Sequence, residues 1–329
     1  MQCRHLGNSS VNISPIIFGA WAIGGWMWGG SNEDDAIAAI HASIDNGVTT
    51  IDTAAIYGMG YSEELVGKAI KGRRDKVVIA TKCGFRWDTD EGSDPWPQKD
   101  NQGKDVTILK NSKPASIAAE CENSLKRLGV DAIDLYQIHS FDSSTPVEES
   151  WEAMVQLKKQ GKVKAIGVSN YKLPQLTQAH NLYPVDSLQP PFSLLRRGIE
   201  NDLLPFCQKN NIAVLAYSPL ERGLLTGKVG VNRSFAPGDH RANLANYTPE
   251  NRKRILEALG KIQPIADKHH AALSQIILAC TLHYPGITAV IAGARNAQQA
   301  AENAKALALA LSAEEQEFIM KEINSTIIQ

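Results

Sequence analysis

Eight short runs of largely apolar residues recur along this chain, and each run is followed by a segment with helical periodicity. Near-continuous apolar runs are typical of strands that are buried on both faces in a parallel sheet. The sequence therefore predicts parallel strands joined by helical crossovers. The predicted strands are Ile16–Gly19, Val48–Thr53, Val77–Lys82, Ile133–His139, Ala165–Asn170, Ser187–Phe192, Ala213–Pro219 and Ala289–Gly293.

The ends of the helical segments support this alternation. Proline opens two of them and glycine directly follows three of them, which is the usual asymmetry of helix ends. The clearest predicted helices are Asp34–Asn46, Ser62–Ile70, Pro114–Leu128 and Pro146–Gln160. Eight strand–helix units in 329 residues favour a closed (β/α)8 TIM barrel over an open doubly wound sheet.

A doubly wound dinucleotide-binding sheet would need a glycine fingerprint after its first strand. The nearest match, Gly58-Met59-Gly60, follows the second predicted strand and lacks the third glycine. The chain also shows no break in composition that would divide it. We therefore expect one barrel domain over residues 1–329.

Three connections are longer than ordinary strand-to-helix loops: Ala20–Asn32, Cys83 to about Lys113, and Leu220 to about Thr248. A short N-terminal hairpin is expected within Cys3–Ser14, before the first barrel strand. The three long loops all follow strands, so they should gather at the carboxyl-terminal face of the barrel, where such folds build their sites. Four tryptophans in these loops form a candidate wall of a substrate pocket, or else an apolar cluster beneath the loops: Trp21, Trp26, Trp28 and Trp87.

Charge and cysteine content exclude several classes of function. The chain carries 34 Lys and Arg against 35 Asp and Glu, a formal net charge of −1, which does not favour nucleic acid or an anionic membrane as a partner. No segment offers the roughly 18 uninterrupted apolar residues of a membrane helix, and the first residues do not resemble a signal peptide. Five scattered cysteines without a C-x-x-C pair indicate reduced thiols and no metal site. We expect a cytoplasmic protein of undetermined oligomeric state.

Polar, titratable residues stand at the ends of three consecutive predicted strands. Asp52 ends the second strand and Tyr57 follows it, Lys82 ends the third, and His139 ends the fourth. Taken singly, each has an ordinary structural explanation, such as a cap, a satisfied core histidine or a packing tyrosine. Because the carboxyl ends of parallel strands meet at one mouth of a barrel, the four side chains should converge there.

Such a group suits proton delivery to a developing alkoxide. A phenol titrates near pH 10, an adjacent ammonium lowers that pKa, and a carboxylate behind the ammonium keeps it charged and in place. A neighbouring imidazole can donate a hydrogen bond to a carbonyl oxygen. Since an alkoxide forms from a carbonyl by hydride addition, a reduced nicotinamide is the natural cofactor.

Longer motifs around these residues resemble the aldo-keto reductase family over nearly the whole chain. They are Asp52-Thr53-Ala54-Ala55-Ile56-Tyr57-Gly58, Ser62-Glu63-Glu64-Leu65-Val66-Gly67, Ala80-Thr81-Lys82, Leu128-Gly129-Val130-Asp131 through Tyr136-Gln137-Ile138-His139, Gly167-Val168-Ser169-Asn170, Tyr217-Ser218-Pro219-Leu220 and Gly293-Ala294-Arg295-Asn296. The resemblance implies a (β/α)8 barrel that reduces a small carbonyl substrate with NADPH. It also implies the catalytic tetrad Asp52, Tyr57, Lys82 and His139, with Tyr57 as proton donor.

The same resemblance implies the cofactor-binding residues, taken position by position. Ser169, Asn170 and Gln189 resemble the residues that hold the nicotinamide carboxamide, and Phe192 stands where a tyrosine usually stacks on the ring. The expected pyrophosphate segment contains Tyr217, Ser218, Leu220, Gly223 and Lys228. The expected adenosine end contains Gly293, Arg295, Gln299 and Asn303.

Arg295 also stands out without the resemblance, because it follows the eighth predicted strand where a helix begins. Phosphate sites in such barrels lie there, and a guanidinium suits a 2′-phosphate in charge and geometry. An alternative function stays open, since relatives of this family serve as nucleotide-binding beta subunits of potassium channels. The complete tetrad favours the NADP-dependent oxidoreductase, whereas the sequence does not indicate its natural substrate.

Overall fold

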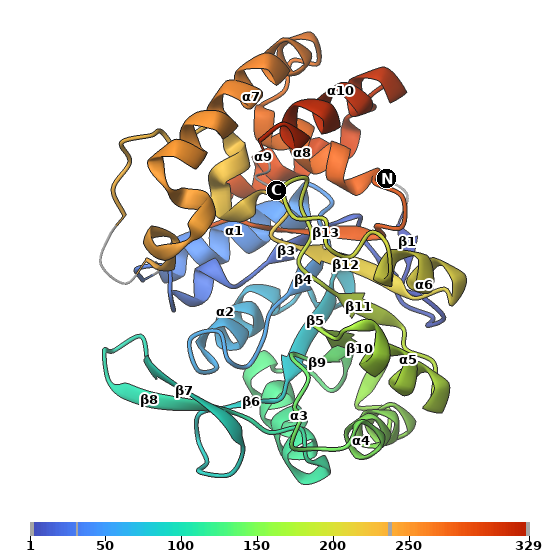
Figure 1. Cartoon of the computed structure of the whole chain (residues 1–329). Helices are drawn as coiled ribbons and strands as arrows, with labels where there is room; N and C mark the ends of the chain where they lie inside the picture. Colours follow the sequence, from blue (N-terminus) through green and yellow to red (C-terminus); the bar gives the residue numbers. More distant parts are fainter. Residues whose placement is uncertain (1–2, 31, 236–238, 327–329) are drawn as a thin grey trace.

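A closed ring of parallel strands forms the centre of the computed structural model, which describes residues 3–30, 32–235 and 239–326 (Figure 1). The predicted loops and the predicted domain therefore include a few positions outside the described residues, namely 31, 236–238 and both termini. Around the ring the strands are β3 (Ile16–Gly19), β4 (Thr50–Asp52), β5 (Val78–Cys83), β9 (Ile133–Ile138), β10 (Val163–Ser169), β11 (Ser187–Gln189), β12 (Ala213–Tyr217) and β13 (Ala289–Gly293). β13 pairs with β3 and closes the barrel. This confirms the predicted (β/α)8 barrel, and each predicted run overlaps one of these strands, although β5 ends one residue later and β10 begins two residues earlier than predicted.

Helices surround the barrel in the order that the strand–helix alternation predicts. They are α1 (Glu33–Asp45), α2 (Tyr61–Ile70), α3 (Pro114–Leu128), α4 (Val147–Lys159), α5 (Leu173–Leu182), α6 (Leu203–Lys209), α7 (Pro249–Lys268), α8 (Leu273–Leu282), α9 (Ala297–Lys305) and α10 (Ala313–Asn324). Local signals fix their ends: Asn32 caps α1 by accepting a hydrogen bond from the Asp35 amide at 2.9 Å, and Gly129 ends α3 at φ 65°. Within the described residues, no helix is long and apolar enough to cross a membrane.

The predicted N-terminal hairpin is present as β1 (Arg4–His5) and β2 (Asn12–Ile13). Its apolar side chains Leu6, Val11 and Ile13 belong to the same buried cluster as the inward-facing barrel residues Ile17 and Leu135. The hairpin therefore fills one end of the barrel interior, which leaves the opposite end for the long loops.

The long connection predicted from Cys83 to about Lys113 is not an irregular loop. It contains β6 (Phe85–Arg86), β7 (Ser93–Lys99) and β8 (Asp105–Lys110), which form an antiparallel sheet in the order β6-β8-β7. Pro95 and Pro97 lie in β7, which is an edge strand, and edge strands tolerate proline because one side of the strand needs no amide donor. Figure 1 shows this sheet as an arm that extends away from the barrel strands.

An ion pair between a buried glutamate and a partly exposed arginine fixes α2 against its neighbours and so positions the residues before it. Glu63 on α2 is fully buried; it accepts hydrogen bonds from Thr81 Oγ1 of β5 at 2.5 Å and from Arg127 Nε of α3 at 2.7 Å. Arg127 also lies against Gly60, where an added Cβ would come within 2.7 Å of its side chain. The turn that holds Tyr57 is thus fastened to the strand that holds Lys82.

We expect Arg127→Met to lower the free energy of unfolding by about 3–5 kcal/mol, because it leaves the Glu63 carboxylate buried without a counter-charge. The double variant Glu63→Gln/Arg127→Met should regain most of that loss. Urea unfolding measures both. Arg73→Met is the matched control, since the Arg73–Asp45 pair is largely exposed and such pairs contribute roughly 0–1 kcal/mol. Equal losses for Arg73→Met and Arg127→Met would contradict this assignment.

Candidate active site

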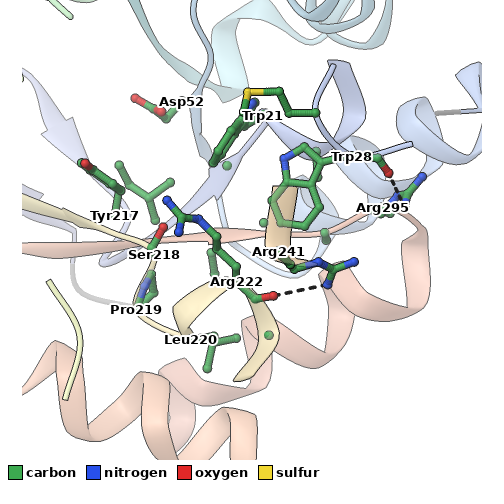
Figure 2. A pocket seen from close by; sticks show the side chains of 18 of the residues that line it. Trp21, Trp28, Asp52, Tyr217, Ser218, Pro219, Leu220, Arg222, Arg241 and Arg295 are labelled. Carbon is green, nitrogen blue, oxygen red and sulfur yellow. Dashed lines mark hydrogen bonds between the residues drawn. The ribbon is translucent and has the colours of Figure 1, made fainter. Parts of the chain in front are cut away.

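A large cavity opens at the carboxyl-terminal ends of the barrel strands (Figure 2). Its volume is about 790 Å³, and its walls come mainly from the loops after β3, β4, β12 and β13. Tyr57 and His139 line one part of it, and Arg295 lines another. The cavity therefore joins two groups of residues that the sequence analysis predicted separately.

Asp52, Tyr57 and Lys82 form one hydrogen-bonded group beside this cavity. Lys82 Nζ donates to Asp52 Oδ1 at 2.7 Å and to the Thr53 carbonyl at 2.8 Å, and it lies 3.4 Å from Tyr57 Oη. The Lys82 side chain has no exposed surface and the Asp52 side chain is 4% exposed. Gln189 Nε2 of β11 donates to the second Asp52 oxygen at 2.8 Å, so the carboxylate is held from across the barrel.

His139 stands next to this group. Its ring centre lies 5.6 Å from that of Tyr57 and 5.0 Å from that of Phe85, edge to face in both cases. Asn170 Nδ2 donates to the His139 carbonyl at 2.9 Å and thereby holds the backbone after β9. The structure thus brings the four predicted residues of the tetrad together.

Burial sets the protonation states of these groups. Burial, followed by the Asp52 charge, raises the pKa of Tyr57 well above its ordinary value. Burial lowers the pKa of Lys82, although Asp52 opposes that change. Burial and then the Lys82 charge lower the pKa of His139 well below its ordinary value. We expected the ammonium to lower the pKa of the phenol; in the structure the loss of hydration is the larger effect, and the phenol stays protonated at neutral pH.

Most of the predicted cofactor-binding residues line the cavity. They are Ser169, Asn170, Gln189, Tyr217, Ser218, Leu220, Gly223, Lys228, Gly293, Arg295, Gln299 and Asn303. Asn170 connects two of the strand ends, because its side chain also contacts Ser169 Oγ at 3.0 Å and accepts from Tyr217 Oη at 2.9 Å. Trp21, Trp26 and Trp28 line the cavity as well.

Two predicted residues lie elsewhere. Phe192 is 1% exposed and packs against Tyr284 with ring centres 5.0 Å apart, and it is not part of the cavity wall. The ring that reaches the cavity from this side of the barrel belongs to Tyr217, at the end of β12. Trp87 packs at the edge of the apolar cluster around Trp26 but does not line the cavity.

Arg295 has partners on the tryptophan-containing loop after β3. Its guanidinium donates to the Trp28 carbonyl at 3.4 Å and to the Gly30 carbonyl at 2.6 Å, and its own amide donates to Gln299 Oε1 at 3.0 Å. Arg295 is nevertheless exposed and lies on the cavity wall (Figure 2). Its charge is thus paired here only with backbone carbonyl dipoles among the contacts described.

The sequence analysis missed three arginines that line the cavity, all in the long segment after β12: Arg222, Arg233 and Arg241. Figure 2 shows the Arg222 side chain directed into the cavity, where its guanidinium lies 6.0 Å from the Trp21 ring centre. Arg241 donates to the Arg222 carbonyl at 3.4 Å, pairs with Asp239 at 2.6 Å and lies 5.1 Å from the Trp28 ring centre. No local pattern marks them, because only the folded course of this segment turns their side chains inward.

The backbone at Arg222 is in the left-handed region, with φ 53° and ψ 30°. Tyr247 holds this conformation, since its one hydroxyl proton is shared between the Glu221 carbonyl at 2.8 Å and the Arg222 carbonyl at 2.9 Å. Left-handed backbone at residues other than glycine costs energy and is often found at functional sites.

Among the described residues, no group of three or more His, Cys, Asp or Glu side chains is placed to bind a metal ion.

Comparison with known proteins gives one consistent result. Residues 15–324 match the model of the aldo/keto reductase family. The chain is 36% identical to the NADH-specific methylglyoxal reductase of Escherichia coli, over 93% of this chain and 94% of that protein.

Solved structures agree with this result. The glycerol dehydrogenase of Gluconobacter oxydans has a TM-score of 0.88 and 34% identity, covering 99% of this chain and 96% of that one. An aldo-keto reductase from Klebsiella pneumoniae in complex with NADPH has a TM-score of 0.73 and 28% identity, covering 98% of this chain and 95% of that one. With its barrel, its cavity and these relatives, the chain belongs to the aldo/keto reductase family of oxidoreductases.

Proposed function

We propose that this protein reduces an aldehyde or ketone to an alcohol with NADPH, and that Tyr57 donates the proton. The observation that carries the proposal is the position of Lys82 Nζ, buried 2.7 Å from Asp52 and 3.4 Å from the Tyr57 hydroxyl, directly behind two residues that line the large cavity. A buried ammonium beside a phenol supports the release of the phenolic proton to a developing alkoxide.

The protein's own residues divide the work of proton transfer. The high pKa of Tyr57 keeps its proton in place until negative charge develops on the substrate oxygen. The Lys82 ammonium then stabilises the phenolate that remains, and Asp52 keeps the ammonium charged and fixed. Gln189 holds Asp52 in turn, so the geometry does not have to reorganise during the reaction.

His139 orients the carbonyl group. Because its pKa is low, the imidazole is neutral at pH 7 and has one ring N–H to donate. A neutral donor next to Lys82 avoids repulsion between two cations and binds a carbonyl oxygen without protonating it. A bound reduced nicotinamide supplies the hydride for the carbonyl carbon.

The cavity fits such a dinucleotide in its chemistry. Amide side chains of Asn170 and Gln189 lie near the tetrad, and cationic side chains of Arg222, Lys228 and Arg295 lie along the rest of the wall. Arg222 Nε is buried and has no hydrogen-bond partner among the described residues. A buried guanidinium nitrogen without a partner favours an anionic ligand such as a pyrophosphate.

The choice of NADPH rests on Arg295. Relatives differ in this respect, since the E. coli protein is named as NADH-specific and the Klebsiella structure contains NADPH. An exposed guanidinium on the cavity wall that is held only by carbonyl groups can exchange them for a phosphate, whose charge it prefers. We therefore place the 2′-phosphate at Arg295.

We expect Tyr57→Phe to lower kcat by ~100-fold or more with 4-nitrobenzaldehyde as substrate, because it removes the proton donor and keeps the ring. The affinity for NADPH should change little. NADPH absorbance measures turnover, and Tyr61→Phe is the control for loss of a nearby tyrosine hydroxyl. A Tyr57→Phe variant with nearly normal kcat would refute the assignment. A wild type that binds NADPH and consumes none would favour a nucleotide-binding regulatory subunit instead.

The pH dependence of kcat/KM should show no inflection near 6.5, the ordinary pKa of histidine. Burial lowers the pKa of His139, so the imidazole stays neutral as pH falls from 8 to 6 and protonates only well below that range. His139→Gln should lower kcat/KM by a similar factor at every pH between 6 and 8. An inflection near 6.5 that is present in the wild type and lost in His139→Gln would contradict a neutral imidazole.

Arg295→Ala should raise the Kd for NADPH about 10- to 150-fold, the equivalent of roughly 1.5–3 kcal/mol for hydrogen bonds to a charged group. The Kd for NADH should change much less. Arg295 can affect cofactor binding in two ways, by binding the 2′-phosphate and by holding the loop carbonyls. Fluorescence titration with both cofactors separates them, since the loss of the contacts to the loop would weaken the binding of NADPH and NADH alike. Equal losses, or a wild type that prefers NADH, would show that Arg295 does not bind the phosphate.

A further inference from the structure

The β6–β8 arm contributes to the cavity, although it lies outside the barrel. Phe85 of β6 and Trp96 of β7 both line the cavity that contains Tyr57 and His139. The Trp96 ring centre lies 5.6 Å from that of Trp26, and Trp96 is 41% exposed. The position of the arm therefore decides where one wall of the cavity stands.

The base of the arm is firmly attached. Asp142, in the loop after β9, accepts hydrogen bonds from Ser93 Oγ at 2.8 Å and from the Ser112 amide at 2.9 Å. Ser93 is the first residue of β7, and Ser112 follows the end of β8. Side chains of Ser144 and Thr145 donate to the same carboxylate. Burial raises the pKa of Asp142, but its hydrogen bonds, that of Ser144 first, together outweigh burial and lower the pKa to about 2. The base is thus tied to the loop that follows His139.

The tip of the arm is attached through one amide side chain. Asn101 Nδ2 donates to the Gly24 carbonyl at 2.8 Å. Gly58 leaves the space for this contact: a Cβ at Gly58 would lie 2.5 Å from the Gly24 oxygen and 2.8 Å from Asn101 Nδ2. The tip therefore rests on the backbone of the residue that follows Tyr57.

Between these two ties, the buried side chain of Ile108 in β8 packs in the apolar cluster around Trp26, whereas its cross-strand partner Trp96 stays partly exposed. A second cavity of about 700 Å³ lies between the hairpin and the loop after β3, lined by Gly25, Trp26 and Asn101 among others. The ion pairs of the hairpin strands, Lys99–Asp105 and Lys110–Asp94, join the arm to itself. Loss of the Asn101 bond would detach the part of the hairpin beyond Ile108 from the Gly24 backbone, and the position of the Trp96 ring would then depend on its contacts with Trp26 and with its cross-strand neighbour Ile108.

We propose that Asn101 is a positioning residue that sets the affinity for large carbonyl substrates by holding Trp96 over the cavity. This inference rests on the proposed carbonyl reduction. A substrate long enough to touch Trp96 binds more tightly when the arm is fixed, because an arm that moves freely offers the same contact for only part of the time. A small aldehyde that fits beside Tyr57 and His139 does not reach Trp96, so its affinity does not depend on where Trp96 is held.

The test compares biphenyl-4-carbaldehyde with propanal. We expect Asn101→Ala and Asn101→Asp, which has almost the same size but no N–H to donate, to raise KM about 3- to 10-fold for the biphenyl aldehyde, the range for one hydrogen bond. Its kcat, and both constants for propanal, should stay unchanged. Gln102→Ala, the next residue along the exposed tip, is the matched control and should behave as the wild type.

A second comparison shows whether Asn101 acts through Trp96. In a Trp96→Ala background, Asn101→Ala should raise KM for the biphenyl aldehyde less than twofold, because the group that it positions is gone. Equal effects with and without Trp96, equal shifts for both aldehydes, or no shift at all would overturn the inference. In those cases the wild type still reduces propanal; a wild type that reduces neither aldehyde overturns the proposed function, and this inference with it.

Discussion

The buried ion pair between Asp52 and Lys82 is the interaction on which the site depends. Two unit charges inside a barrel are costly, and a pair is stable only where further hydrogen bonds complete both partners. Here the Thr53 carbonyl accepts a further hydrogen bond from the Lys82 ammonium. Gln189, on the far side of the ring, donates one to the second oxygen of Asp52. The closed barrel is therefore a requirement of the chemistry, since an open sheet would not bring β4, β5 and β11 to one point.

The barrel and the four residues of the tetrad could be predicted from the sequence, because that prediction needed only the order of the strands along the chain and the residues at their carboxyl ends. Parallel strands have their carboxyl ends at the same face, so Asp52, Lys82 and His139 had to converge once the barrel was recognised. Tyr57 follows within one turn, and the compact turn between β4 and α2 leaves it little freedom. Apolar runs located the strands, because a strand that is buried on both faces has apolar side chains at nearly every position and shows no alternation of polar and apolar residues.

The remaining features depend on contacts between distant parts of the chain. Phe192 and Tyr217 both stand near strand ends, and only the bend after β11 decides that Phe192 packs on Tyr284 while Tyr217 reaches the cavity. The sequence predicted only a long connection where β7 lies, because prolines are rare in strands except at an edge and a sequence does not show that a strand will lie at an edge. Arg222 points inward only because Tyr247, 25 residues further along the chain, holds its carbonyl in a left-handed turn.

The cavity combines two electrostatic regions with opposite properties. Around Asp52 and Lys82 the charges cancel within the barrel, and burial keeps Tyr57 protonated and His139 neutral, so this region presents hydrogen-bond donors and no net charge of its own. Along the outer wall, Arg222 and Arg295 are held by ring faces and carbonyl groups, which do not cancel their charge. A ligand that is anionic at one end and neutral at the other matches both regions in one orientation only, because the reverse orientation would bury its negative charge against Asp52 and leave the arginines without an anion.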